Sequence, residues 1–182
     1  MHMKAQAAIF VIVAAGLITA CTHSRHSVTD TAQENPLSDQ SQPVTDDFSV
    51  SPQISVADVQ TAAARGVTLI INNRPDGEMI GQPTSAEIAA AAEAAGVAYA
   101  YIPVDRRGIT PDHLDAFDQA ISEPHNGKTL AFCRSGMRSI TVRSYAAARA
   151  GRPTADIIAE AAAAGYDLAG HAPALEALRT DN

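Results

Sequence analysis

The sequence predicts an α/β fold in which helices cover both faces of a mostly parallel β-sheet. The first observation is a set of short, continuous apolar runs rich in β-branched residues, at 67–71, 97–104 and 129–132. Such runs are typical of strands that are buried on both faces. The second observation is that helical segments separate these runs, and a strand–helix–strand connection pairs its strands in parallel. We therefore expect three layers, with the sheet in the middle.

Helices are expected where an N-terminal signal and a C-terminal glycine bracket a segment. Capping boxes begin two of these segments, at 55–58 and 84–87, and Thr110 followed by Pro111 begins another. Thr154 is expected to cap the last of them. The predicted helices cover 55–66, 84–96, 110–122, 138–151 and 154–165.

Bulk composition restricts the classes of function. The 182 residues suffice for one domain with a hydrophobic core. A formal net charge of −7 argues against a nucleic-acid partner, because such partners require a basic surface. The domain histidines His113, His125 and His171 lack the spacing of metal ligands. Neither a metal nor a cofactor is expected.

The first twenty residues are predicted to be a bacterial signal peptide. Lys4 supplies a positive charge, and 5–17 is an apolar stretch too short to span a membrane. The small residues before Cys21 are similar to the lipobox of bacterial lipoproteins, in which cleavage leaves the cysteine as a lipidated N-terminus. The alternative is an ordinary cleaved signal with an incidental cysteine.

The segment 21–47 is expected to be a flexible linker between the lipid anchor and the domain. It is rich in Ser, Thr, Asp, Gln and Pro, and it lacks apolar periodicity. The catalytic domain is then expected over 48–182. A lipid on Cys21 would hold the protein at the membrane of the bacterial cell envelope, with the domain facing the periplasm.

Three segments are expected at the carboxyl ends of the strands, where parallel sheets bind their ligands. These segments are 72–83, 103–110 and 133–138. The first contains Arg74 and Asp76, which are candidates for substrate binding, and the second contains Asp105, a candidate for proton transfer. For Asp76 the alternative is turn formation, and for Asp105 it is a solvated loop charge.

Cys133 ends a buried strand and begins a tight turn that leads into a helix. Backbone N–H groups of such a turn can converge on an anion. Here those groups belong to Arg134, Ser135, Gly136 and Met137. Together with the helix dipole and Arg138, they would stabilise a thiolate, the nucleophilic form of cysteine. Ser139 would donate its hydroxyl to the sulfur as a covalent intermediate breaks down. The alternatives are a buried structural cysteine and a disulfide with Cys21.

Four motifs together resemble the phosphatase-like domain of the beta-lactamase hydrolase-like proteins. These motifs are 72–78, 102–104, 133–139 and 164–167. The resemblance covers nearly all of 48–180, and it implies a fold like that of the dual-specificity protein phosphatases, with four to five strands. The family also occurs with rhodanese and persulfide-dioxygenase modules, and it is described both as phosphatase-like and as a sulfur transferase.

The length of the loop favours sulfur transfer as the first prediction. Four residues separate Cys133 from Arg138, whereas protein tyrosine phosphatases have one more. Phe132 also stands where those enzymes usually carry a histidine. A shorter loop offers one amide fewer to a phosphoryl group, and its length matches rhodanese-type sulfurtransferases. We therefore expect a persulfide on Cys133, formed from a small anionic sulfur donor and passed to a thiol acceptor.

Asp105 favours a second prediction, the hydrolysis of phosphate monoesters through a cysteinyl-phosphate. It follows the Ile-Pro-Val motif, where dual-specificity phosphatases carry the general acid that protonates the leaving oxygen. Asp76 and Glu78 are further candidates for this acid. A third prediction is a redox-sensing or ligand-binding lipoprotein whose thiolate is oxidised without turnover.

Overall fold

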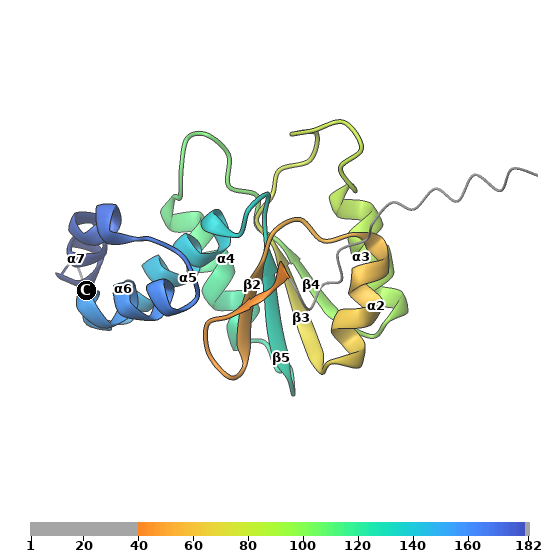
Figure 1. Ribbon diagram of the computed structural model, residues 1–182, viewed down its shortest axis with the longest axis horizontal. Helices are drawn as coiled ribbons and strands as arrows, with labels where there is room; N and C mark the ends of the chain where they lie inside the picture. Colours follow the sequence, from red (N-terminus) through yellow and green to blue (C-terminus); the bar gives the residue numbers. More distant parts are fainter. Residues whose placement is uncertain (1–39, 181–182) are drawn as a thin grey trace, which may run out of the picture. The chain divides into compact units, whose positions relative to one another are not determined.

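The structure is a computed structural model in which residues 40–180 are described (Figure 1). The predicted signal peptide, Cys21 and most of the predicted linker lie outside these residues. Over 40–180, no helix combines the length and the hydropathy needed to cross a lipid bilayer.

A five-stranded sheet forms the centre of the fold, with the strand order β1-β2-β5-β3-β4. Strands β2, β5, β3 and β4 are parallel, and β1 runs antiparallel to β2. The strands are β1 Gln42–Pro43, β2 Phe48–Ser51, β3 Val67–Asn72, β4 Ala98–Tyr101 and β5 Lys128–Phe132. The prediction of a mostly parallel sheet of four to five strands is confirmed.

Helices cover both faces of this sheet (Figure 1). On one face α2 packs against α3, and on the other α4 packs against α5, which also contacts α6 and α7. The helices are α2 Val56–Ala64, α3 Ser85–Ala94, α4 Pro111–Ser122, α5 Met137–Arg149, α6 Thr154–Ala163, the 3-10 helix η1 Ala169–His171, and α7 Ala172–Thr180. Because parallel strands need crossover connections, this sequence of elements produces the predicted three-layer α/β/α fold.

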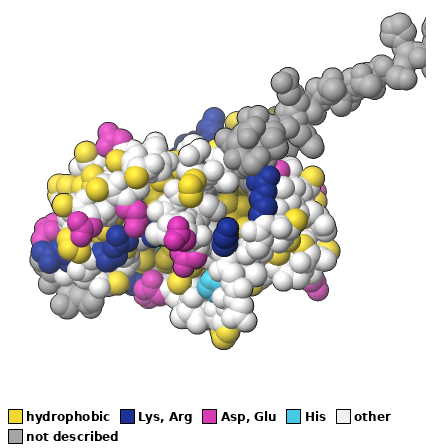
Figure 2. All heavy atoms as spheres, turned by 60° about the horizontal axis from the view of Figure 1, so that its bottom comes forward, with side chains coloured by type: hydrophobic (Ala, Val, Ile, Leu, Met, Phe, Trp, Pro, Cys, Tyr) yellow, Lys and Arg dark blue, Asp and Glu magenta, His cyan; other side chains and the backbone are white. Residues whose placement is uncertain are grey.

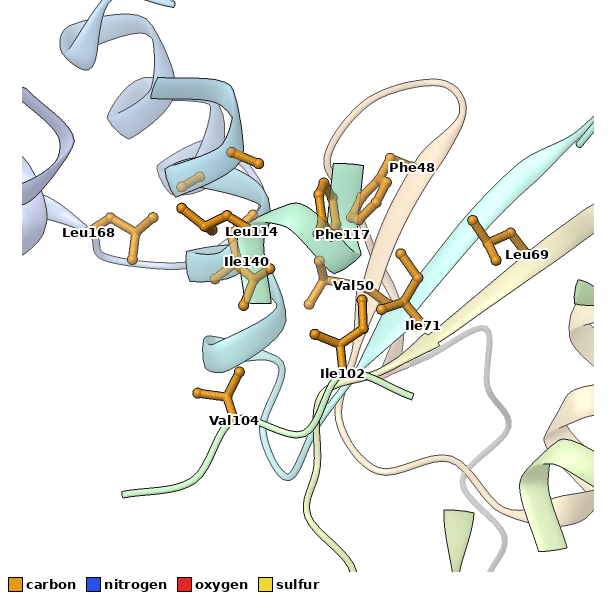
Figure 3. Packing of buried hydrophobic residues seen from close by; sticks show 14 residues of the cluster. Phe48, Val50, Leu69, Ile71, Ile102, Val104, Leu114, Phe117, Ile140 and Leu168 are labelled. Atoms are coloured by element: carbon orange, nitrogen blue, oxygen red, sulfur yellow. The ribbon is translucent and has the colours of Figure 1, made fainter. Parts of the chain in front are cut away.

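Strand β5 is buried on both faces, which explains why it reads as a continuous apolar run. Leu130 and Phe132 pack toward α2 and α3, whereas Ala131 packs toward α4 and α5. Figure 3 shows the core on the α4 and α5 side, where side chains of these helices meet those of the sheet. Its labelled members include Phe48, Val50, Ile71, Leu114, Phe117 and Ile140.

Local sequence signals set most of the helix boundaries. The capping boxes at 55–58 and 84–87 form as expected, and α4 begins at Pro111. Thr154 is not a cap, however, because the capping position of α6 is Pro153 and the Thr154 hydroxyl instead donates to Glu176 of α7 at 2.8 Å. A threonine that has a tertiary partner need not bond its own backbone.

Two parts of the fold lie where the sequence did not indicate them. Strand β1 falls inside the stretch 21–47 that reads as a linker, so the fold begins before the expected boundary at Phe48. Two of the four residues of β2 are serines, which weakens its apolar signal. Helix α7 was also not predicted, and its Leu175 packs against Ala148 of α5. These elements form because of the strands and helices that they pair with or pack against, more than because of their own hydrophobic pattern.

Candidate active site

The carboxyl ends of the central strands lie side by side. Ser51 of β2 and Asn72 of β3 both pair with Phe132 of β5. Cys133 therefore leaves the sheet between the segments that follow β2 and β3, and its N–H donates to the Ser51 carbonyl at 3.4 Å. The segments that follow β3, β4 and β5 emerge at one end of the sheet (Figure 1). The three segments expected to form the site thus share that end.

Cys133 is buried at the N-terminus of α5. Its side chain forms no disulfide and is only 1% exposed. The N–H of Gly136 donates to the Cys133 sulfur at 3.1 Å, and Gly136 is the residue before α5. This amide and the dipole of a 13-residue helix place positive potential at the sulfur. The environment suits an anionic sulfur or a small bound anion.

Gly136 cannot be replaced by another residue without disturbing the loop. Its φ is +87°, in the left-handed region that favours glycine. A Cβ at this position would lie 2.1 Å from the hydroxyl oxygen of Tyr166. Burial, and second the charge of Cys133, raise the pKa of Tyr166, so its phenol stays protonated near the loop. The sequence indicated Tyr166 only as part of a motif, and its contact with the anion cradle, the loop 133–138 with its backbone N–H groups, was missed.

Arg138 is held in one orientation by two acceptors. Its Nη1 and Nη2 donate to the two carboxylate oxygens of Glu78 at 2.7 and 2.8 Å, and Nη1 also donates to the Val104 carbonyl at 2.8 Å. A guanidinium has five N–H groups, so the Nε–H and one Nη2–H stay available. Glu78 first, and also the Cys133 sulfur, raise the pKa of Arg138. The remaining donors therefore serve the sulfur and a bound anion.

Glu78 is shared between two arginines. Its carboxylate also accepts from the Nε of Arg74 at 3.0 Å, and Arg74 is 3% exposed. Gln53 accepts from the Nη1 of Arg74 at 2.8 Å. Arg138 first, and Arg74 as well, lower the pKa of Glu78, while burial opposes them. Glu78 is therefore ionised at neutral pH, which speaks against its expected role as an acid and points to a positioning role.

The side chain of Arg74, a predicted substrate-binding residue, is buried behind Glu78. Its guanidinium is buried between Gln53 and Glu78, and its backbone N–H donates to Asn72 Oδ1 at 2.9 Å. Its Nη2 has no partner within residues 40–180. The contacts that the structure shows make Arg74 a support for Glu78.

The carboxylates of Asp76 and Asp105 both accept hydrogen bonds from other residues. Asp76 Oδ1 accepts from the N–H of Ser85, the first residue of α3, at 2.7 Å, so this carboxylate stabilises the start of a helix nine residues away and not the local turn that the alternative named. Asp105 accepts from the backbone N–H and the Nε of Arg107 at 2.8 and 2.9 Å. The hydrogen bonds from Arg107 lower the pKa of Asp105. Asp105 adjoins Val104, whose carbonyl binds Arg138, but its carboxylate is paired elsewhere.

The other residues predicted for the loop differ in exposure. Ser139 is fully buried, and its hydroxyl has no partner among the described residues, so it is available to the sulfur or to a ligand. The side chains of Arg134, Ser135 and Met137 are exposed at the outer side of the loop. Their backbone amides, not their side chains, are the groups that can contribute to the cradle.

No cluster of three or more metal-ligating side chains occurs within residues 40–180. The histidines make hydrogen bonds to other side chains and to the backbone instead. His113 Nδ1 accepts from the N–H of Thr110 at 2.9 Å, and His171 Nδ1 lies 2.9 Å from the Tyr145 hydroxyl. At the other end of the strands, acidic and basic side chains are interspersed over the surface (Figure 2).

A cysteine and an arginine on one strand-to-helix loop, within a three-layer α/β/α fold, are features of phosphatase-like domains. The family model described as "Beta-lactamase hydrolase-like protein, phosphatase-like domain" matches residues 41–151, and the chain belongs to this family. A beta-lactamase hydrolase-like protein of Agrobacterium fabrum is 38% identical over 105 residues, which cover 58% of this chain and 24% of that protein. The match thus spans about a quarter of the length of this relative.

Solved structures give the same assignment. A candidate phosphatase from Neisseria meningitidis has a TM-score of 0.67 and 34% identity, over 76% of this chain and 97% of its own. A PP-IP phosphatase from S. cerevisiae has a TM-score of 0.56 and 15% identity, over 75% of this chain and 83% of its own. At that identity the second likeness shows the fold alone. Both lie within the dual-specificity-phosphatase-like fold that the resemblance implied.

Proposed function

We propose that the protein hydrolyses phosphate monoesters through a phosphoryl group carried on Cys133. The observation that carries this proposal is the preset orientation of Arg138 beside the Cys133 sulfur, with Glu78 and Val104 occupying the donors that face away. Two N–H groups on one edge of a guanidinium match two oxygens of a phosphoryl group. The family and the structural neighbours, which are phosphatase-like, support the same reaction.

The reaction has two balanced steps. In the first, the Cys133 thiolate attacks phosphorus and the ester P–O bond breaks. The leaving oxygen keeps the electron pair of that bond and takes a proton from a general acid, for which Asp105 is the candidate. In the second, water attacks phosphorus, the P–S bond breaks and the thiolate returns, while the acid regains its proton from the water. Arg138 and the loop amides would stabilise the charge on the equatorial oxygens in both steps.

Sulfur transfer, which the sequence placed first, is supported by two features of the loop. The loop has one residue fewer than that of the protein tyrosine phosphatases, and within residues 40–180 the Gly136 amide is the one backbone donor at hydrogen-bond distance from the sulfur. A terminal sulfur on Cys133 needs fewer donors than three phosphoryl oxygens. The comparisons, however, support the phosphatase alternative.

The two reactions are distinguished with one protein preparation. We expect purified residues 40–182 to release phosphate from aryl phosphates, and we expect Cys133→Ser to abolish this release. In parallel, the protein is incubated with thiosulfate, and its intact mass is measured before and after cyanide is added, because cyanide removes the carried sulfur as thiocyanate. A Cys133-dependent gain of one sulfur atom, together with no phosphate release, would replace the phosphatase proposal by sulfur transfer.

We also propose that a lipid on Cys21 anchors the domain at the bacterial cell envelope, facing the periplasm. The apolar stretch 5–17 and the small residues before Cys21 support this proposal. Metabolic labelling with a fatty acid should mark the full chain but not Cys21→Ser. Labelling of both proteins, or of neither, would contradict the anchor.

A further inference from the structure

Exposed apolar residues adjoin, in the chain, both partners of the ion pair that fixes Arg138. Among residues 40–180, the large apolar side chains with high exposure are Val56, Met79, Ile80, Tyr101 and Met137. Met79 follows Glu78, and Met137 precedes Arg138. Two of these apolar residues thus adjoin the two partners of one salt bridge. Scattered exposed apolar residues need no explanation, but a group around a site does.

The segment that carries Met79 and Ile80 is built to present them. Ile80 lies at the corner of a turn in which the N–H of Gln82 donates to the Met79 carbonyl at 3.3 Å, and Gly81 supplies the positive φ of +79°. The side-chain amide of Gln82 donates to the Pro75 carbonyl at 2.9 Å and closes the segment. Ile80 is 102% exposed, so it contributes nothing to the core.

In-line phosphoryl transfer restricts the direction in which the leaving group points. Cys133 is 1% exposed and lies at the base of the loop. In phosphoryl transfer the attacking and leaving atoms are roughly in line, on opposite sides of phosphorus. The alcohol part of the ester must therefore point away from the buried sulfur, out toward the surface. Met79 and Ile80 are exposed on the segment that holds Arg138 through Glu78.

We propose that Met79, Ile80 and Met137 form an apolar rim that contacts the alcohol part of the substrate. The inference rests on the proposed phosphatase activity and adds its substrate class, which is phosphate monoesters of apolar alcohols. Ile and Met supply adaptable aliphatic surface, which favours alkyl and alkyl-aryl groups over polyols. Sugar phosphates, whose hydroxyls would lose water at such a rim, are disfavoured.

The test uses phenyl phosphate and its 4-methyl, 4-ethyl and 4-butyl derivatives, all below the concentration at which they form micelles. Their leaving groups have nearly equal acidity, so differences in kcat/KM report contacts of the alkyl chain. Full burial of one CH2 group is worth about a fourfold change, and a partly open rim should give about twofold for each CH2. The slope of log(kcat/KM) against the number of CH2 groups should therefore be positive in the wild type. We expect this slope to flatten in Met79→Ser and Ile80→Ser.

The control variant is Val56→Ser, since Val56 is 45% exposed but adjoins neither Glu78 nor Arg138. It should keep the wild-type slope. Turnover without any dependence on chain length would overturn the rim and leave the phosphatase proposal standing. Loss of the slope in Val56→Ser would also overturn it. The assay is repeated with phosphatidylglycerol vesicles, and a slope that appears only in their presence would assign the apolar preference to the membrane surface and overturn the rim. Wild-type protein that turns over none of the esters would overturn both proposals.

Discussion

The loop 133–138 and the loop 105–110 lie at the same end of the sheet but are built differently. The first is tied to distant parts of the chain, because Arg138 binds Glu78 and the Gly136 backbone meets Tyr166. The second is tied mainly to itself, with Asp105 paired to Arg107 two residues away. The difference indicates that the anion cradle is preformed, whereas the candidate proton donor is not yet in place.

The strongest way to break this comparison is to remove the sulfur. Cys133→Ser should lower the turnover of aryl phosphates by more than about a thousandfold, because a serine hydroxyl is a far weaker nucleophile than a thiolate. Phosphate release measures the effect. The control is binding of tungstate, which should persist in the variant because Arg138 and the loop amides are unchanged. Activity within tenfold of the wild type would rule out a covalent role for Cys133.

The next effect tests the close approach of Tyr166 to the loop. Gly136→Ala must place a side chain at φ +87° and against the Tyr166 hydroxyl. Backbone strain alone costs about 1–3 kcal/mol of unfolding free energy, and we expect the loss in this variant to be larger. We also expect a loss of turnover. Gly151→Ala is the matched control, with φ +88° and nothing within 4 Å of the new Cβ. Thermal unfolding measures both variants. An equal loss of unfolding free energy in Gly136→Ala and Gly151→Ala would contradict the contact with Tyr166.

Glu78 tests whether the cradle depends on a residue far along the chain. Glu78→Gln removes the charge that orients Arg138, and we expect kcat/KM to fall roughly ten- to a hundredfold, the range for a misplaced catalytic group. The conservative Glu78→Asp should recover part of the activity, and Glu93→Gln, an exposed glutamate on α3, should change nothing. A purely structural role would lower the melting temperature without changing kcat/KM of the folded protein.

The same carboxylate predicts a pH dependence. Arg138 and Arg74 lower the pKa of Glu78 below its ordinary value of 4.5. Its contribution to stability is therefore fully present above pH 4.5 and is lost as pH falls through the lower pKa of the folded protein. Thermal unfolding between pH 6 and pH 3 should show a loss on the acid side that is smaller in Glu78→Gln. An equal loss in both proteins would assign it to other groups.

The smallest expected effect belongs to Asp105. A positioned general acid contributes about a hundredfold or more, but this carboxylate is paired with Arg107 and its pKa is lowered. We expect Asp105→Asn to slow aryl phosphate turnover by less than that, with Asp112→Asn, a nearby exposed carboxylate, as the control. A loss of a thousandfold in Asp105→Asn alone would show that the loop rearranges when substrate binds.

The contrast between the two loops also explains what the sequence could predict. Capping boxes, the strand runs at 67–71 and 129–132, and the turn at Cys133 are all encoded within a few residues, so their pattern is readable. The bond between Glu78 and Arg138 joins residues 60 apart, and nothing local identifies Glu78 as its partner rather than as an acid.

The parts of the fold that were missed share this dependence on distant partners. Strand β1 exists because Gln42 and Pro43 pair with β2, and the contact of Tyr166 with Gly136 requires α6 to be in place. Thr154 carries the right side chain for a cap but has Glu176 of α7 within reach. Sequence patterns identified the fold class and a candidate nucleophile, whereas the residues that support the site are brought together by tertiary packing.

The most direct measurement traps the species carried on Cys133. The wild-type protein is mixed with an aryl phosphate, quenched in acid during the first turnovers, digested, and analysed by mass spectrometry. The account predicts one phosphoryl group on the peptide that contains Cys133, absent from Cys133→Ser and lost when turnover is complete. An unmodified Cys133 during steady turnover, or a phosphoryl group on another residue, would contradict it.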